Sequence, residues 1–226
     1  MNQQETIDEF KRALNREPAI LFTGQTAAGK DTQQVIFEQT ARNLGIKNIF
    51  SIVTGDLFRE EESKFSPYFK ELIPNIQKQG KLQSHVFATS LWSHKLLYEY
   101  VRGPIIINGS PRSIGEARNM QSFFSTMERE MIVFCFMVSD DVAKQRIELR
   151  NKEAREAGRP VRTDTDTPEK VQEKLNYFRT DVLPGIEYLD KKPGVSVYTI
   201  DTEHEPIPGI HAQVVNILGT YHNIPR

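Results

Sequence analysis

The chain has 226 residues, a formal net charge of −1, one cysteine and five histidines. This charge creates no global field that would favour nucleic acid or an anionic membrane, the single cysteine excludes an internal disulfide, and no apolar run approaches the ~18 residues of a membrane span. We therefore expect a cytoplasmic protein that binds neither nucleic acid nor a membrane. Its length suits one α/β domain with a modest insertion or two small domains.

The apolar residues predict an alternation of helices and strands. Ile7, Phe10 and Leu14 recur at helical spacing before the first strand, and a last amphipathic helix is expected through residues 214–218. Between them lie five short apolar runs, at residues 19–22, 49–53, 105–107, 131–138 and 195–200. Strands separated by helices predict a three-layer α/β fold, in which a five-stranded parallel sheet is covered on both faces. Cys135 falls in the fourth run, where we expect a buried, unreactive thiol.

A glycine-rich segment follows the first predicted strand. Residues 24–32 read Gly-Gln-Thr-Ala-Ala-Gly-Lys-Asp-Thr, with a helical pattern after them. The two glycines let successive N–H groups turn inward, while the helix N-terminus and Lys30 add positive charge. The segment therefore predicts a phosphate-binding loop for a nucleotide. A plain glycine-rich turn with an exposed lysine is the alternative, and it leaves Lys30 and Thr32 unexplained.

Polar residues also follow the other predicted strands, and ligands of such sheets gather beyond the carboxyl ends of the strands. The fourth strand leads into a helix that carries Arg146 and Arg150 one turn apart, on one face. The remaining segments are 54–59 (Thr-Gly-Asp-Leu-Phe-Arg), 108–112 (Asn-Gly-Ser-Pro-Arg) and 201–206, which contains Glu205. Basic residues cluster between 144 and 162, and such a patch on a neutral protein suits a small polyanion. For each arginine, the alternative is a solvated surface ion pair.

Taken in order, these motifs resemble those of the adenylate kinase family of nucleoside monophosphate kinases, from about residue 19 to residue 218. Residues 54–59 are similar to the family's Ser/Thr-Gly-Asp-Leu-Leu-Arg, and 109–112 to the end of its Asp-Gly-Phe-Pro-Arg. Gly80-Lys81-Leu82 resembles its Gly-x-Leu-Val. Arg146 and Arg150 match the arginine pair before the lid, and residues 158–164 look like a short lid without the zinc-binding insertion.

The resemblance implies a P-loop NTPase fold in three parts and a specific reaction. Residues 1–53, 86–150 and 168–226 would form the core, 54–85 a small helical segment over the nucleoside monophosphate (NMP), and 151–167 a short lid over ATP. The γ-phosphoryl group of ATP would pass reversibly to AMP or a related NMP, giving ADP and a nucleoside diphosphate. The cofactor would be Mg²⁺, and we expect a monomer.

The resemblance also assigns roles by position. The ATP site would comprise Gly24, Gln25, Thr26, Ala27, Ala28, Gly29, Lys30, Asp31, Thr32, Arg146 and Glu205. The NMP site would comprise Thr54, Gly55, Arg59, Leu82, Gly109, Arg112 and Glu116. Catalysis would fall to Lys30, Arg112, Arg150, Arg159 and Arg162. These residue types suit the reaction, because phosphoryl transfer to an anionic acceptor needs alignment and charge neutralisation but no protein base. Arginine forks engage phosphate oxygens in pairs.

One departure from the family concerns the metal. The family's aspartate that orders magnesium waters is Asn108 here, whereas the usually small residue after the loop lysine is Asp31. Our hypothesis is that the magnesium-facing carboxylate has moved to Asp31, with Thr32 and Asp56 contributing. Alternatively, Asp31 is an ordinary acid in the first turn of a helix.

A second departure concerns the acceptor. Glu116 replaces the family's glutamine for the adenine of AMP, and an ionised glutamate only accepts hydrogen bonds, which weakens the expectation of AMP. Alternatively, a neighbouring residue reads the base, or Glu116 lies on the helix surface. Ser110 and Gln83, in place of phenylalanine and valine, also indicate a rebuilt acceptor pocket. Three alternatives therefore stay open: a kinase for a non-adenine NMP or dNMP, another small-molecule kinase, and a nucleotide-binding module with little catalysis.

Overall fold

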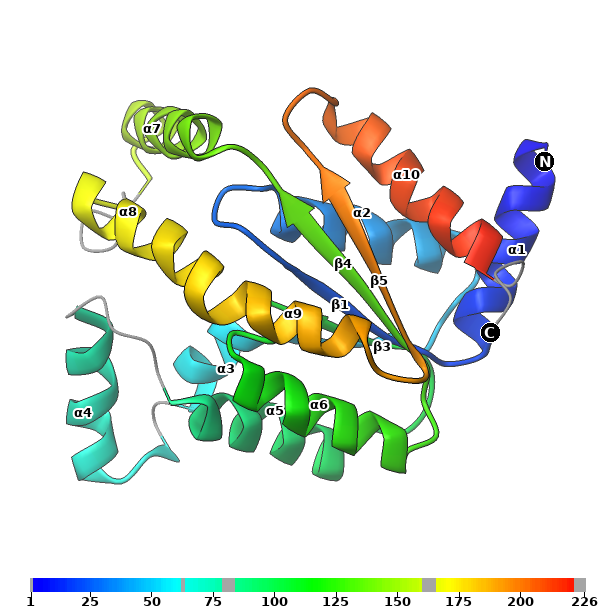
Figure 1. Cartoon of the computed structure of the whole chain (residues 1–226), viewed down its shortest axis with the longest axis horizontal. Helices are drawn as coiled ribbons and strands as arrows, with labels where there is room; N and C mark the ends of the chain where they lie inside the picture. The colour runs from blue at the N-terminus through cyan, green and yellow to red at the C-terminus, as the bar shows by residue number, and fades with distance from the viewer. Residues whose placement is uncertain (1, 62–63, 79–83, 160–165, 222–226) are drawn as a thin grey trace.

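A computed structural model describes residues 2–61, 64–78, 84–159 and 166–221. Its centre is a sheet of five parallel strands in the order β2-β3-β1-β4-β5 (Figure 1). The strands are β1 (Ala19–Gly24), β2 (Phe50–Val53), β3 (Ile105–Asn108), β4 (Met131–Met137) and β5 (Val195–Asp201). All five predicted strands and their parallel arrangement are confirmed.

Helices cover both faces of the sheet, as predicted. One face carries α1 (Gln3–Asn15), α2 (Lys30–Asn43) and α10 (Ile207–Thr220). The other carries α5 (His85–Glu99), α6 (Ile114–Thr126) and α9 (Leu183–Asp190) (Figure 1). The helices α1 and α10, which lie near the start and the end of the described residues, pack against each other.

The strand side chains alternate between these two layers because successive residues of a strand point to opposite faces. Ile20 and Phe22 of β1 belong to the core that includes Phe37 of α2, whereas Leu21 belongs to the core that includes Trp92 of α5. All of these side chains are fully buried. Burial on both faces explains why the central strands read as continuous apolar runs instead of alternating ones.

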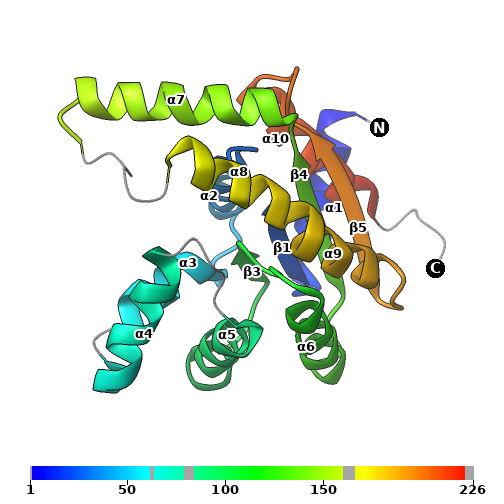
Figure 2. The ribbon, with the colours of Figure 1, turned by 60° about the vertical axis from the view of Figure 1, so that its left-hand side comes forward.

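Two further pairs of helices extend beyond the carboxyl ends of the strands. After β2 come α3 (Thr54–Glu61) and α4 (Pro67–Lys78), and after β4 come α7 (Asp140–Glu156) and α8 (Pro168–Tyr177). A single π-helical turn, η2 (Phe178–Val182), joins α8 to α9. Figure 2 shows α3 and α4 on one side of this end of the sheet and α7 and α8 on the other. The fold thus places two arms around the strand ends that the sequence singled out.

Among the described residues, no helix combines the length and apolar character that crossing a membrane requires.

Candidate active site

The predicted phosphate-binding loop lies at the carboxyl end of the central strand β1. Gly24 has φ +136°, and a Cβ atom there would lie 2.2 Å from the carbonyl oxygen of Phe136 in β4. Gly29, with φ +82°, precedes the first residue of α2, which is Lys30. The loop needs glycine at the first position because the backbone of β4 leaves no room for a side chain. The observed strand, loop and helix are those expected from the spacing.

The loop is held from the side by α7 and η2. The side-chain amide of Gln25, which is buried, donates to Asp140 Oδ1 at 2.9 Å, and Arg179 Nη2 donates to the same oxygen at 2.5 Å. The Arg179 guanidinium holds the pKa of Asp140 below its usual value. Arg146 Nη1 donates to the carbonyl oxygen of Ala27 at 3.3 Å, while Nη2 donates to the carbonyl oxygen of Thr202 at 2.5 Å. Arg146 therefore joins the loop to the turn after β5.

Lys30 lies where positive charges from several elements meet. Its side chain is 22 % exposed, and its Nζ lies 3.5 Å from Asp31 Oδ1. Burial lowers the pKa of Lys30, and the charges of Arg112 and Arg150 lower it further, against the opposing effect of Asp31. Three cations predicted to act on phosphate, from the loops after β1 and β3 and from the helix after β4, thus share one electrostatic environment. Such a concentration of positive charge suits a polyphosphate.

The loop after β3 carries Arg112 in a fixed orientation. Arg112 Nε donates to the carbonyl oxygen of Gly109 at 2.8 Å, and the backbone N–H of Arg112 donates to Glu116 Oε2 at 2.7 Å. From the other arm, the Tyr177 hydroxyl donates to the carbonyl oxygen of Arg112. Glu116 is fully buried in the first turn of α6, so it does not lie on the helix surface. Thr54, also fully buried, opens α3 directly opposite, with its Oγ1 2.8 Å from Ser110 Oγ.

Asn108 and Asp31, the two departures from the family that concern the metal, are hydrogen-bonded to each other. Asn108 Nδ2 donates to Asp31 Oδ1 at 2.9 Å and to Gln34 Oε1 at 2.7 Å. The one oxygen of this side chain, Asn108 Oδ1, is buried and has no hydrogen-bond partner among the described residues. Asp31 itself is exposed in the first turn of α2. The carboxylate expected at position 108 is thus replaced by one immediately beside it.

The stems of the predicted lid are tied together by Asp166. This side chain is 2 % exposed; Oδ2 accepts from Arg150 Nη2 at 2.5 Å, and Oδ1 accepts from Lys174 Nζ at 3.1 Å. Burial alone would raise the pKa of Asp166, but the two cations together outweigh burial and hold it below its usual value. Thr167 begins α8: its hydroxyl caps the helix, and Pro168 is the first helical residue.

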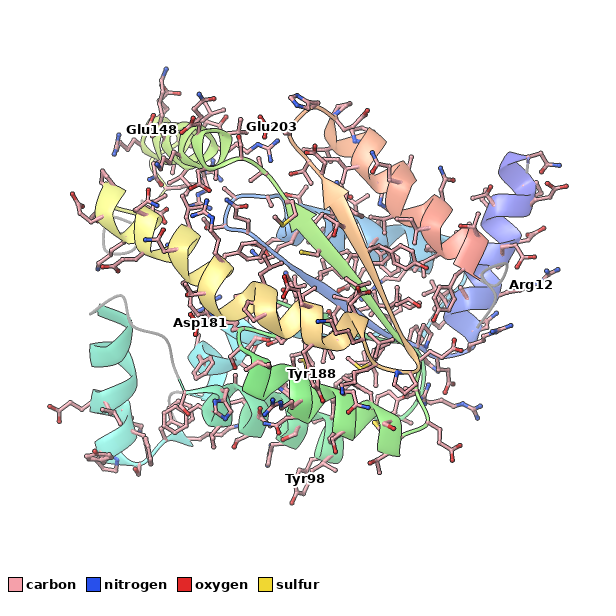
Figure 3. All side chains as sticks on the ribbon, viewed as in Figure 1. Arg12, Tyr98, Glu148, Asp181, Tyr188 and Glu203 are labelled. Carbon is pink, nitrogen blue, oxygen red and sulfur yellow. The ribbon has the colours of Figure 1, made fainter. Side chains whose placement is uncertain are left out.

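Several other predicted site residues are exposed to solvent. Arg59 forms an ion pair with Asp56 of the same helix, α3, and its side chain is 70 % exposed. Arg159, Thr32 and Glu205 are exposed as well. Glu205 lies in the turn after β5, two residues after Glu203, which Figure 3 labels. Glu203 Oε2 accepts from the backbone N–H of Ser139 at 2.9 Å. Leu82 and Arg162 lie outside the described residues.

Sequence reasoning did not predict Lys174, Tyr177 or Asp140 as parts of this site. Lys174 and Tyr177 follow ordinary helical spacing in α8, and only the packing of α8 beside α7 and the β3 loop brings them to Arg150 and Arg112. Asp140 reads as a first-turn acid of α7, and its bond to Gln25 links positions 115 residues apart. In the sequence, only the motifs that contain Arg150, Arg112 and Gln25 indicated a site here. Nothing distinguished the residues that contact them.

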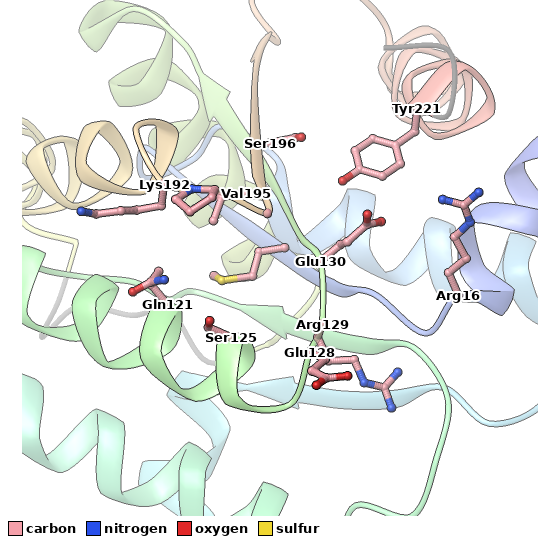
Figure 4. Close-up of a pocket in the computed structure, with 13 residues that line it drawn as sticks. Arg16, Gln121, Ser125, Glu128, Arg129, Glu130, Lys192, Val195, Ser196 and Tyr221 are labelled. Atoms are coloured by element: carbon pink, nitrogen blue, oxygen red, sulfur yellow. The ribbon is translucent and has the colours of Figure 1, made fainter. Parts of the chain in front are cut away.

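A hollow of about 810 Å³ lies at the opposite end of the sheet, where β4 and β5 begin (Figure 4). Arg16, Glu130 and Lys192 are among the residues that line it. It is separated from the phosphate-binding loop by the length of the strands, so it takes no part in the site built above.

A comparison with known protein families shows to which family the chain belongs. The adenylate kinase family model matches residues 22–193, which cover most of the chain, including the phosphate-binding loop and the loop after β3. The chain belongs to the adenylate kinase family. As a member, it is a nucleotide phosphotransferase of the class that transfers phosphate between ATP and nucleoside monophosphates, and the fold expected from the resemblance is confirmed.

Individual relatives agree over most of their length. The chain is 25 % identical over 220 residues to an adenylate kinase of Thermosipho melanesiensis, covering 88 % of this chain and 98 % of the relative. An adenylate kinase of Methylobacterium radiotolerans is 26 % identical over 200 residues, covering 88 % and 94 %. One of Rickettsia africae is 27 % identical over 191 residues, covering 75 % and 85 %. The chain is therefore similar to whole enzymes and not to a fragment of them.

Proposed function

We propose that this protein is an ATP-dependent nucleoside monophosphate kinase that converts AMP and ATP reversibly into two molecules of ADP. The observation that carries the proposal is the phosphate-binding loop at the carboxyl end of β1, where a Cβ atom on Gly24 would lie 2.2 Å from the Phe136 carbonyl oxygen and Lys30 begins α2. Arg112 after β3 and Arg150 in the helix after β4 add their charges to that of Lys30. A protein that only binds a nucleotide has no need of cations around the phosphate that is transferred.

The proposed mechanism relies on position and charge. The inward-turned loop amides and Lys30 bind the ATP phosphates, while Arg112 binds the acceptor phosphate from the opposite side. Arg150, which pairs with Asp166 in this structure, binds the transferred group when the nucleotides are bound. No protein base is required because the attacking oxygen of the acceptor is already an anion. We assign Arg159 and Arg162 to the lid and Arg59 to the acceptor phosphate, as their motifs imply.

The residues around Asp31 fit a magnesium ion. Mg²⁺ prefers oxygen ligands and keeps several waters when it is bound beside phosphates. Asp31 supplies an exposed carboxylate, and the unpartnered Oδ1 of Asn108 is an acceptor for one such water. The ion would neutralise charge on the phosphates as it develops during transfer. Asp56 is paired with Arg59, so we assign it to orienting that arginine.

AMP is our preferred acceptor. The sequence argument for another base required Glu116 to face that base, and both Glu116 oxygens are hydrogen-bonded within the protein. A kinase for a non-adenine NMP or dNMP is the alternative, since Ser110 does differ from the family's phenylalanine. A monomeric state and a cytoplasmic location stay predictions.

Turnover against a panel of acceptors tests the proposal. ATP with Mg²⁺ is incubated with AMP, GMP, CMP, UMP or their deoxy forms, and nucleoside diphosphates are separated by chromatography. We expect AMP to be converted fastest. Faster turnover of another base would replace AMP as the acceptor, and no turnover of any acceptor despite ATP binding would favour the binding module.

Asp31→Asn tests the relocated carboxylate. The variant keeps the shape and the contact with Asn108 but removes the charge that would face the cation. We expect Mg²⁺ to strengthen ATP binding several-fold less in the variant than in the wild type, while metal-free ATP binds equally well or better because a repulsion is lost. Calorimetric titration with and without Mg²⁺ measures both. Asp141→Asn, an exposed first-turn acid of α7, is the matched control; an equal metal effect in Asp31→Asn and wild type would contradict the assignment.

A further inference from the structure

Glu116 is the centre of a buried chain of hydrogen bonds under the acceptor loop. Its side chain has 0 % exposure. Oε1 accepts from Ser110 Oγ at 2.6 Å, and Oε2 accepts from the backbone N–H of Arg112 at 2.7 Å. Because the Ser110 hydroxyl has only one proton and donates it to Glu116, the Thr54 hydroxyl must donate across the 2.8 Å to Ser110 Oγ. The chain thus runs from Thr54 through Ser110 and Glu116 to Arg112.

This chain of bonds connects two strand ends. Thr54 begins α3, the first helix after β2, and Arg112 lies between β3 and α6. The backbone of Arg112 is thereby held through its N–H by Glu116 and through its carbonyl by Tyr177, while its own Nε donates to Gly109. With three of its groups fixed, the guanidinium is oriented before any ligand arrives. Preorganisation of this kind lowers the cost of binding an anion.

The two departures from the family at positions 110 and 116 are hydrogen-bonded to each other, so each accounts for the other. A serine at 110 provides a hydroxyl donor, and a glutamate at 116 provides two acceptors in a place where two donors meet. A carboxylate in an otherwise apolar layer beside Trp92 is stable only when it is hydrogen-bonded, and here both oxygens are satisfied. Neither oxygen is left to read a base.

We propose that Glu116 is a positioning residue that orients Arg112 for the phosphate of the acceptor and takes no part in recognising its base. This proposal rests on the proposed function, since it names the group that prepares the acceptor-phosphate site. Its signature is specific: loss of Glu116 weakens binding of the phosphate of every acceptor equally.

The experiment measures binding, so it does not require turnover. Dissociation constants of AMP, GMP, CMP and UMP, and of adenosine as the phosphate-free probe, are determined by calorimetry for wild type, Glu116→Leu and Glu116→Gln. Glu116→Leu removes both acceptors; we expect all the monophosphates that bind wild type to bind about tenfold more weakly, with adenosine and MgATP unchanged. Glu116→Gln can still accept from the Arg112 N–H and donate to Ser110 Oγ, so it should restore most of the loss for every base.

Further variants keep the test decisive. Ser110→Ala is expected to weaken monophosphate binding severalfold and to add less in the Glu116→Leu background, because both changes break the same chain of bonds. Glu187→Gln, an exposed acid of α9, is the control. A change in base preference in Glu116→Gln would overturn the proposal in favour of base reading, and so would an adenosine affinity that falls with that of AMP. If no monophosphate binds wild type, it is the proposed function that fails.

Discussion

Asp166 forms ion pairs with a cation from each stem of the predicted lid, Arg150 of α7 and Lys174 of α8. It is buried, yet both cations that it binds are partly exposed, Arg150 at 46 % and Lys174 at 39 %. Solvent screens the two pairs, so their contribution lies toward the lower end of the range for charged hydrogen bonds. We expect Asp166→Asn to lower the free energy of unfolding by about 1–2 kcal/mol at pH 7. Urea denaturation followed by circular dichroism measures this difference, with Glu173→Gln, an exposed acid of α8, as the control.

The same substitution has a pH dependence with a definite sign. The folded-state pKa of Asp166 is lowered, so its contribution is fully present above the unfolded value of about 4 and disappears as the pH falls through the folded-state pKa. The difference between wild type and Asp166→Asn should therefore stay constant from pH 7 to about 5 and shrink below that. A difference that persisted unchanged at pH 3 would show that Asp166 contributes through packing and not through its charge.

Residues differ in how far the sequence predicts them. The places of Lys30, Arg112 and Arg150 in the fold were predictable because each belongs to a motif that follows a predicted strand, whereas their roles stay predictions. The environment of Glu116 was not: its distance from Arg112 along the chain was known, but its burial depends on Ser110 and Thr54 meeting above it. Whether a carboxylate is buried depends on how the folded chain packs, and the spacing of residues along the sequence does not show this.

At the scale of elements, the approach of α9 to α6 supports the acceptor loop. Gly185 of α9 faces the start of α6, where an added Cβ would lie 2.9 Å from the Ser113 carbonyl oxygen and 3.0 Å from its carbon. These are backbone atoms one residue after Arg112, so they cannot turn aside. We expect Gly185→Ala to destabilise the protein by about 1–2 kcal/mol, since overpacking outweighs the gain in helix propensity.

A second helical glycine provides the control. In α10, a Cβ on Gly209 would come too close to Glu205 Oε2, the end of a flexible side chain, and would make an ordinary contact of 3.5 Å with Pro206 Cδ, so Gly209→Ala should leave stability unchanged or raise it by up to about 1 kcal/mol. Urea denaturation of both variants measures the contrast. Equal stability of Gly185→Ala and wild type would mean that α9 and α6 can separate without cost, and that their contact does not hold the loop.

The alternation of strands and helices was predictable, because apolar runs of strand length are separated by helical segments. The path from α8 to α9 was not, since η2 is a π-helical turn that shifts the helical register by one residue and leads Arg179 to Asp140. A search of the sequence for a period of 3.6 residues does not detect a π-helical turn. The lid expectation for residues 160–165 lies outside the described residues.

At the scale of the whole molecule, the helix layers on both faces pack against one sheet, and we therefore expect the core to unfold as a unit. Cys135, the only cysteine of the chain, lies in β4 between β1 and β5 and is buried. Burial raises the pKa of its thiol to about 12, so the native thiol is both covered and protonated at pH 8. Its alkylation therefore requires the sheet to open.

Labelling of Cys135 by iodoacetamide at pH 8 tests this cooperativity and ATP binding together. If only global unfolding exposes the thiol, a ligand that binds the native state alone slows labelling by the factor 1 + [L]/Kd, which is about 100-fold at 100 times Kd. We expect MgATP to slow labelling by that factor and to raise the urea midpoint in step, because opening of β4 dismantles the phosphate-binding loop that Phe136 supports. Labelling that MgATP leaves unchanged, while the midpoint still rises, would instead reveal a local opening of β4 with the ATP site intact.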